Sequence, residues 1–78
     1  MVAQAYVLIQ TDVKMAAQVA SRITEIKGVT LAENCTGPYD VIVRTEARNL
    51  DELETLVVAK VRQVEGITRT LTCSVVHL

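Results

Sequence analysis

The segments ITEIKGVT, residues 23–30, and VRQVEGIT, residues 61–68, align without a gap at a spacing of 38 residues. Upstream of each, apolar residues recur at positions i, i+4, i+8 and i+11, which is the spacing of one helical face. The two sets are Met15, Val19, Ile23 and Ile26, and Leu53, Val57, Val61 and Val64. The sequence therefore predicts two amphipathic helices, each followed by a short apolar segment.

Capping residues indicate where these helices begin and end. Asn49 is a good N-cap for the second helix, with Glu52 three residues later as its capping-box partner. The first helix has a weaker start signal, near Thr11 or Asp12. Each aligned segment contains a glycine, and Gly28 and Gly66 are predicted to end the two helices.

Four remaining segments have the composition of β-strands: residues 3–10, 29–35, 40–46 and 67–77. The element order is then βαββαβ. Right-handed connections turn this order into a ferredoxin-like α+β fold, a four-stranded antiparallel sheet with both helices on one face. The expected spatial order is fourth, first, third, second strand. A chain of 78 residues forms one such domain, over residues 1–78.

Composition restricts how so small a domain is stabilised. Half of the residues are hydrophobic, but Phe and Trp are absent, so the core is expected to be aliphatic. Cys35 and Cys73 lie on opposite edge strands of the predicted sheet and lack C-x-x-C spacing, and His77 is the single histidine. We therefore expect no disulfide, metal or cofactor. Oligomerisation remains as the additional source of stability.

The charge and hydropathy of the sequence disfavour two further classes of protein, those that bind nucleic acid directly and those that cross a membrane. The net charge is −1 and the basic residues are scattered, which disfavours direct binding of nucleic acid. The apolar runs are too short to cross a membrane, and no signal-peptide pattern is present at the N-terminus. The sequence predicts a soluble, cytoplasmic protein with reduced thiols and no membrane partner.

The sheet has a second face that two helices do not cover. Strand alternation places Tyr6 and Leu8 opposite Val7 and Ile9, and Val76 continues the same apolar character on the last strand. Soluble proteins rarely expose such a patch, so we expect a homodimer packed sheet to sheet. The alternative is that Tyr6 and Leu8 are isolated surface residues.

The turn between the second and third strands reads TGPYD, residues 36–40. Gly37 permits a positive φ and Pro38 fixes its own φ, so the turn is stiff before a ligand arrives. Asp40 can accept hydrogen bonds from an ammonium group, and Tyr39 can cover an aliphatic side chain. These four residues are the candidate ligand site. The alternative is that Asp40 only caps amides of its own hairpin.

The last strand carries a threonine series, Thr68, Thr70 and Thr72. Alternate residues of a strand share a face, so three hydroxyl groups are expected to align toward a ligand carboxylate or a cross-strand partner. The alternative is the ordinary preference of threonine for strands.

The order βαββαβ, the helix exits IKGV and VEGI, the hairpin TGPYDVIVRTEA and the closing GITRTLTCSVV together resemble the C-terminal effector-binding domain of the Lrp/AsnC, or feast/famine, transcriptional regulators. The most specific element is Gly37 to Asp40 followed directly by an apolar strand. The resemblance implies dimerisation through the sheet, assembly of dimers into rings such as octamers, and an amino-acid effector bound between dimers, with Thr70 and Thr72 in the same cleft. It implies no enzymatic activity.

Regulators of this family also carry an N-terminal helix-turn-helix domain, whereas this chain starts almost directly in its first strand. The resemblance therefore implies action through effector binding, or through co-assembly with a full-length Lrp/AsnC regulator, without direct contact with DNA. The alternative function is a small cofactor-free enzyme of the dimeric α/β-barrel type, a monooxygenase or isomerase. Such enzymes enclose a cavity between sheet and helices, which distinguishes the two classes.

Overall fold

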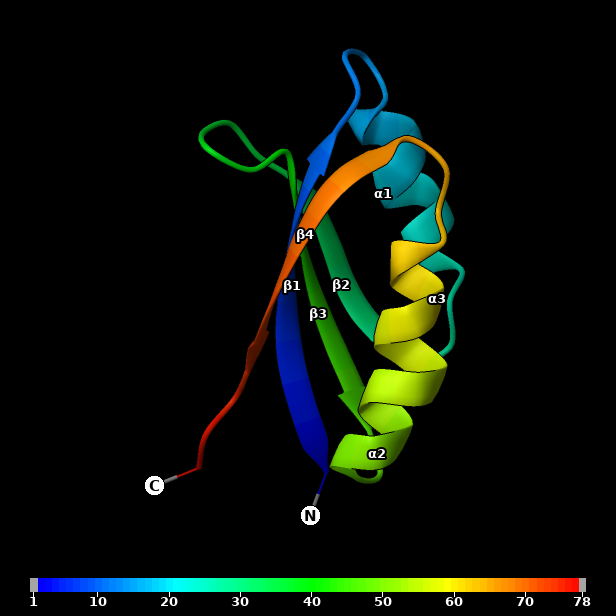
Figure 1. Ribbon diagram of the computed structural model, residues 1–78, viewed down its shortest axis with the longest axis vertical. Helices are drawn as coiled ribbons and strands as arrows, with labels where there is room; N and C mark the ends of the chain where they lie inside the picture. Colours follow the sequence, from blue (N-terminus) through cyan, green and yellow to red (C-terminus); the bar gives the residue numbers. More distant parts are fainter. Residues whose placement is uncertain (1, 78) are drawn as a thin grey trace.

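The computed structural model describes residues 2–77. One layer is an antiparallel sheet of order β2-β3-β1-β4, and the helices form a second layer on one face of it (Figure 1). The elements in chain order are β1 (Ala3–Thr11), α1 (Ala16–Thr24), β2 (Val29–Asn34), β3 (Val41–Ala47), a second helix in three parts, α2 (Leu50–Glu52), η1 (Leu53–Val58) and α3 (Ala59–Arg62), and β4 (Ile67–Ser74). The predicted ferredoxin-like fold and strand order are confirmed.

The core lies between the two layers and is aliphatic. Val7 and Ile9 of β1 and Val41 and Val43 of β3 are fully buried against the helices. The predicted helical faces supply the other side. Their fully or nearly fully buried members are Val19, Ile23, Leu53, Val57 and Val61, and their partly buried members are Met15, Ile26 and Val64. The repeat in the sequence therefore does mark the buried face of both helices.

The start of the first helix was predicted too early. Thr11 is the last residue of β1, and α1 begins only at Ala16. Between them the Asp12 amide donates to the carbonyl of Gly66 at 2.8 Å, and Lys14 has a φ of 67°. A residue in this left-handed conformation cannot continue a helix, which explains the late start.

The ends of both helices were predicted too late. They end at Thr24 and Arg62, one turn before the glycines. Past Thr24 the Ile26 amide bonds to the carbonyl of Ile23 at 3.0 Å, so the chain tightens into turns. Gly28 and Gly66, with φ of 100° and 102°, then lead directly into β2 and β4. The glycines therefore immediately precede the strands and do not end the helices.

The middle of the second helix is a π-helix, η1, which the sequence did not predict. Its i to i+5 hydrogen bonds give a wider turn than an α-helix. Val58 is buried together with Leu53 and Val57, although it lies outside the predicted apolar face. Ala20 holds the equivalent position in the regular helix α1, 38 residues earlier, and is also buried, so this position faces the sheet in both helices.

The predicted N-cap of the second helix is confirmed, but only half of the capping box forms. The Asn49 side chain accepts a hydrogen bond from the Glu52 amide at 2.9 Å. The Glu52 carboxylate instead pairs with Arg48, whose Nε donates to it at 3.1 Å. The cap therefore depends on Asn49.

Replacing this cap is expected to weaken the fold measurably. Asn49→Ala leaves the Glu52 amide without its partner and should lower the free energy of unfolding by about 1 kcal/mol. The matched control is Asn34→Ala at the exposed end of β2. Urea denaturation of both variants at one protein concentration measures the difference, and equal losses would show that Asn49 is no cap.

The outer strands are shorter than predicted. β2 ends at Asn34 and β4 at Ser74, so Cys35 and His77 lie beyond them. One further bond, from the Val75 amide to the Gln4 carbonyl at 2.9 Å, holds the chain after β4 against β1. Cys35 and Cys73 are both free thiols, and they lie at opposite edges of the sheet.

Candidate functional site

The face of the sheet that the helices leave open has an apolar centre. Leu8 lies between Ile42 of β3 and Leu71 of β4 in the strand register. The neighbouring row contains Tyr6, whose ring lies 5.7 Å from the guanidinium carbon of Arg44. Tyr6 is 37% and Leu71 47% exposed. These side chains form one continuous surface, which we call the open sheet face.

The strand register also shows which members of this surface the sequence missed. Leu31 lies opposite Arg44, so it joins the open sheet face with Ile42 and Leu71. Val76 was predicted as an interface residue, but it follows the end of β4 and is 73% exposed. Strand alternation alone could not identify the residues of the open sheet face. A register shift in β2 and the early end of β4 change which residues lie on this face.

The turn of Gly37 to Asp40 projects beyond the sheet at the end opposite to α2 (Figure 1). Gly37 has a φ of 138°, and a Cβ added there would meet nothing within 4 Å. Glycine is therefore required for backbone conformation rather than for space. The Gln10 side chain donates to the carbonyl of Pro38 at 2.8 Å, and the Cys35 thiol donates to the carbonyl of Tyr39 at 3.1 Å. These bonds fix the turn on both flanks.

Asp40 fastens the turn to the neighbouring strand. Its Oδ2 accepts from the Thr11 amide at 2.9 Å and lies 3.4 Å from the Thr11 hydroxyl, while its own amide donates to the carbonyl of Ile9 at 2.8 Å. The carboxylate therefore caps β1 rather than amides of its own hairpin. Among residues 2–77 no hydrogen bond to Oδ1 is found, which leaves this oxygen available to a ligand. The sequence missed Thr11 because it was assigned to a helix start.

The threonines of β4 do not form the single row that was expected. Thr70 and Thr72 lie opposite Ile9 and Val7, whose side chains are buried, so both face the helix layer. The Thr72 hydroxyl is buried and has no hydrogen-bond partner within the described chain. Thr68 lies at a register irregularity and is exposed.

One protomer does not bring the predicted site residues into one pocket. Asp40 and Thr70 lie on either side of Ile9 in the sheet, which separates their backbones by two strand spacings, about 10 Å. Neither of two clefts in the described part of the chain, one beside Gly28 and one beside Ile26, is lined by Asp40 or Thr70. A site built on the turn therefore requires a second surface, such as a neighbouring copy of the chain.

The chain belongs to the Lrp/AsnC ligand-binding domain family, whose model matches residues 4–77. Two uncharacterized HTH-type transcriptional regulators, from Pyrococcus furiosus and Pyrococcus abyssi, are 31% and 33% identical over 55 residues. The match covers 70% of this chain and 37% of each regulator, so this chain corresponds to about a third of these relatives. Both relatives are described as transcriptional regulators.

Solved structures agree with this assignment. A protein of Thermus thermophilus superposes with a TM-score of 0.87 at 27% identity, covering 100% of this chain and 96% of that one. A transcriptional regulator of Neisseria meningitidis, solved as a complex with L-Met, has a TM-score of 0.79 at 16% identity over 96% of this chain and 50% of that one. At 16% identity, the similarity to the Neisseria meningitidis protein shows a common fold and nothing more.

The described residues offer neither a metal site nor a membrane span. No three of their His, Cys, Asp and Glu side chains gather to hold an ion. None of their helices is long and apolar enough to cross a bilayer.

Proposed function

We propose that this domain senses a small molecule, an amino acid, and that it regulates transcription through its assembly rather than by contacting DNA itself. The observation that carries the proposal is the turn of Gly37 to Asp40. It is rigid, it projects from the sheet, and it presents a carboxylate of which one oxygen is anchored and the other is available. A member of a ligand-binding family with such a preorganised acceptor is suited to hold an ammonium group.

Assembly provides the second half of the site. The open sheet face joins two chains in a homodimer, and dimers meet at their turns, as in a ring of dimers. The effector lies in this contact. Its ammonium group meets Asp40 or backbone carbonyls, Tyr39 covers its side chain, and its carboxylate meets main-chain amides. Thr70 and Thr72, which face the helix layer, are not part of this contact. A cytoplasmic Lrp/AsnC regulator that contains a DNA-binding domain can co-assemble with this domain through the same surfaces.

The distribution of side chains supports a sensor over an enzyme of the dimeric α/β-barrel type. The layer between sheet and helices is filled by fully buried aliphatic residues. Among residues 2–77 the one polar residue that is buried as a whole is Thr45, whose hydroxyl donates to the carbonyl of Ala5 at 2.9 Å. The Thr72 hydroxyl is also buried on this side of the sheet. Among residues 2–77 no ionisable side chain that could activate a substrate is buried in this layer.

A calorimetric screen of the twenty amino acids tests the proposal. We expect one or a few to bind at millimolar concentration or below. Asp40→Ala should weaken the best binder by roughly tenfold to a hundredfold, because a charge-assisted hydrogen bond contributes about 1.5 to 3 kcal/mol. Asp51→Ala, at an exposed position in α2, is the control and should bind like the wild type.

Two results would reject the site. One is that no amino acid binds at about 10 mM, a concentration well above the dissociation constant of about 1 mM that marks a weak specific site. The other is that the best binder is unaffected by Asp40→Ala and Tyr39→Ala while both variants keep the wild-type mass. Circular dichroism checks that the variants remain folded, since Asp40 also anchors Thr11.

A further inference from the structure

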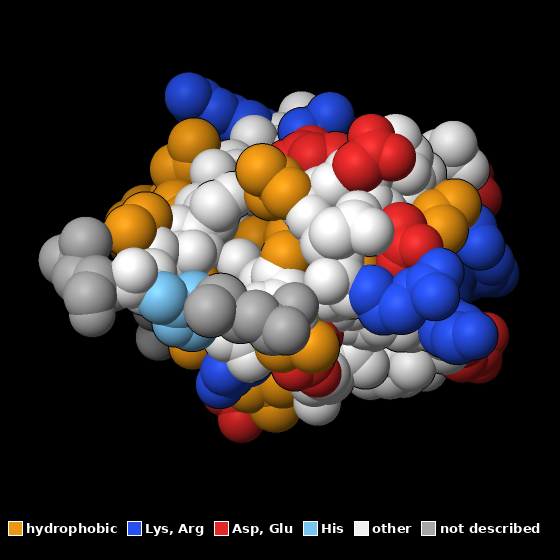
Figure 2. Space-filling model, turned by 90° about the horizontal axis from the view of Figure 1, so that it is seen from below, with side chains coloured by type: hydrophobic (Ala, Val, Ile, Leu, Met, Phe, Trp, Pro, Cys, Tyr) orange, Lys and Arg blue, Asp and Glu red, His pale blue; other side chains and the backbone are white. Residues whose placement is uncertain are grey.

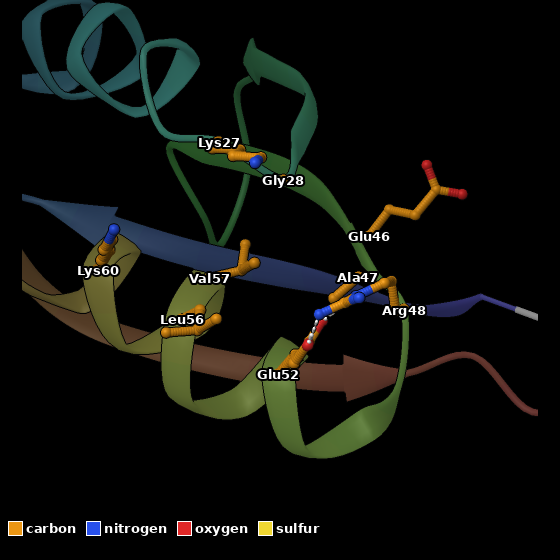
Figure 3. A pocket seen from close by; sticks show the side chains of 9 residues that line it. All are labelled: Lys27, Gly28, Glu46, Ala47, Arg48, Glu52, Leu56, Val57 and Lys60. Carbon is orange, nitrogen blue, oxygen red and sulfur yellow. Dashed lines mark hydrogen bonds and ion pairs between the residues drawn. The ribbon is translucent and has the colours of Figure 1, made fainter.

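A cleft of about 630 Å³ opens at the end of the sheet opposite to the turn of Gly37 to Asp40 (Figure 3). It lies between the start of β2, the end of β3 and the second helix, and its wall includes Lys27, Gly28, Arg48 and Lys60. Its volume falls in the range of ordinary small-molecule sites. The strand register places Ala47 opposite Ala3, whereas Val41, next to the turn, lies opposite Ile9. The cleft is therefore separate from the amino-acid site proposed above.

The floor of the cleft is apolar. Gly28 lies so close to the second helix that a Cβ there would fall 2.5 Å from Cγ2 of Val57. Glycine at this position therefore allows the backbone before β2 to pack closely against the second helix and to form the floor of the cleft with Val57. Leu56 of the π-helical segment stands at its side and is 53% exposed. An aliphatic group of a ligand would cover this leucine and gain the burial of apolar surface.

The rim of the cleft is cationic, although the chain as a whole has a net charge of −1. Lys27, just before β2, and Lys60 of α3 line it from two sides, and neither forms an ion pair among residues 2–77. Figure 2, seen from the end at which α2 lies, shows Lys and Arg side chains on the helix side of the molecule, with Asp and Glu side chains between them.

The carboxylates of the cleft form no ion pair with these two lysines among residues 2–77. Glu52 is held by Arg48, and this hydrogen bond, followed by the charges of Arg48 and Lys27, lowers the pKa of Glu52 below its ordinary value. Glu46 points away from the other lining side chains in Figure 3, and it accepts a hydrogen bond from the Gln4 side chain at 3.3 Å. Two ammonium groups thus remain for an anion.

We propose that this cleft is a second ligand site, and that it binds a small aliphatic carboxylate lacking an amino group. The carboxylate lies between Lys27 and Lys60, and the aliphatic tail lies on Leu56 and Val57. An amino acid fits less well, because its ammonium group would face two lysines and the inward carboxylate of Glu52 is already occupied by Arg48.

The test uses 3-methylbutanoate as the probe, with leucine and 3-methylbutanamide as comparison ligands. Titrations are followed by amide chemical shifts of the isotope-labelled protein. We expect saturable shifts around Gly28 and Leu56 with the carboxylate, and at least roughly tenfold weaker binding of the uncharged amide, since it loses a charge-assisted hydrogen bond. Added salt should weaken the binding because the lysines are exposed.

Substitutions identify the groups responsible. Lys60→Gln and Lys27→Gln should each weaken the carboxylate by roughly tenfold. Arg62→Gln removes the same charge from an exposed position on the same helix outside the cleft and should leave the affinity unchanged. Asp40→Ala should also leave it unchanged, which separates this site from the amino-acid site.

Three results would overturn the proposal. The first is the absence of saturable shifts with 3-methylbutanoate at the highest soluble concentration. The second is equal binding of the carboxylate and its amide, and the third is equal weakening by Arg62→Gln and Lys60→Gln, which would reveal only unspecific attraction of charge.

Discussion

Leu8→Glu is expected to convert the assembled protein into monomers or to unfold it. Leu8 lies at the centre of the open sheet face, between Ile42 and Leu71. A carboxylate at this place would be buried in the dimer without a partner, and burying an unpaired charge costs several kcal/mol. Light scattering coupled to size exclusion at micromolar concentration measures the mass.

The control is Gln18→Glu, which adds the same charge at an exposed position of α1 on the helix side. It should keep the mass of the wild type. A wild-type protein that is folded and monomeric at micromolar concentration would contradict sheet-to-sheet dimerisation, and so would a Leu8→Glu protein with unchanged mass and stability.

Gly28→Ala is expected to destabilise the fold strongly. Besides the positive φ of 100°, the new Cβ would lie 2.5 Å from Val57 and 3.0 Å from the carbonyl oxygen of Glu46. Backbone strain and overpacking each cost about 1 to 3 kcal/mol, so the free energy of unfolding should fall by about 3 kcal/mol or more.

Gly37→Ala provides the comparison, because Gly37 also has a positive φ but has open space around its Cα. It should lose only the strain of the backbone, about 1 to 2 kcal/mol. Urea denaturation at one protein concentration compares the two. Equal losses would mean that the contact between Gly28 and the second helix does not restrict the structure.

The layout of the fold was predictable because it depends on periodic features of the sequence. The apolar spacing from Met15 and from Leu53 marks the buried faces of both helices, and the element order then restricts the topology. The helix boundaries were less predictable. Lys14 adopts a positive φ, and the helices end one turn before Gly28 and Gly66, because local turns compete with helix formation there.

The π-helical segment has no comparable signal in the sequence. The stripe of Leu53, Val57 and Val61 fits an α-helix, and so does the burial of Val58, since Ala20 is buried at the equivalent position of the regular helix α1. Its formation depends on how the helix packs on the sheet, which is a tertiary effect. The cleft beside Leu56 also forms only where the second helix meets β2 and β3, and it was therefore not predicted from the sequence.

The candidate site was predictable in part. The stiffness of the turn follows from Gly37 and Pro38 themselves, whereas the partner of Asp40 is Thr11, far away in the sequence. The faces of the threonines depend on the register between β1 and β4, which shifts between Gln10 and Thr11. Strand alternation cannot predict such a shift.

A crystal structure of the protein with its best-binding amino acid tests the proposed function most directly. We expect the ligand beside Gly37 to Asp40 at a contact between two dimers, with its ammonium group within hydrogen-bond distance of the Asp40 carboxylate and with the open sheet faces paired inside each dimer. An amino acid enclosed within one protomer, between the sheet and the helices, would contradict the proposal, as would an assembly in which the turn faces solvent and the ligand lies elsewhere.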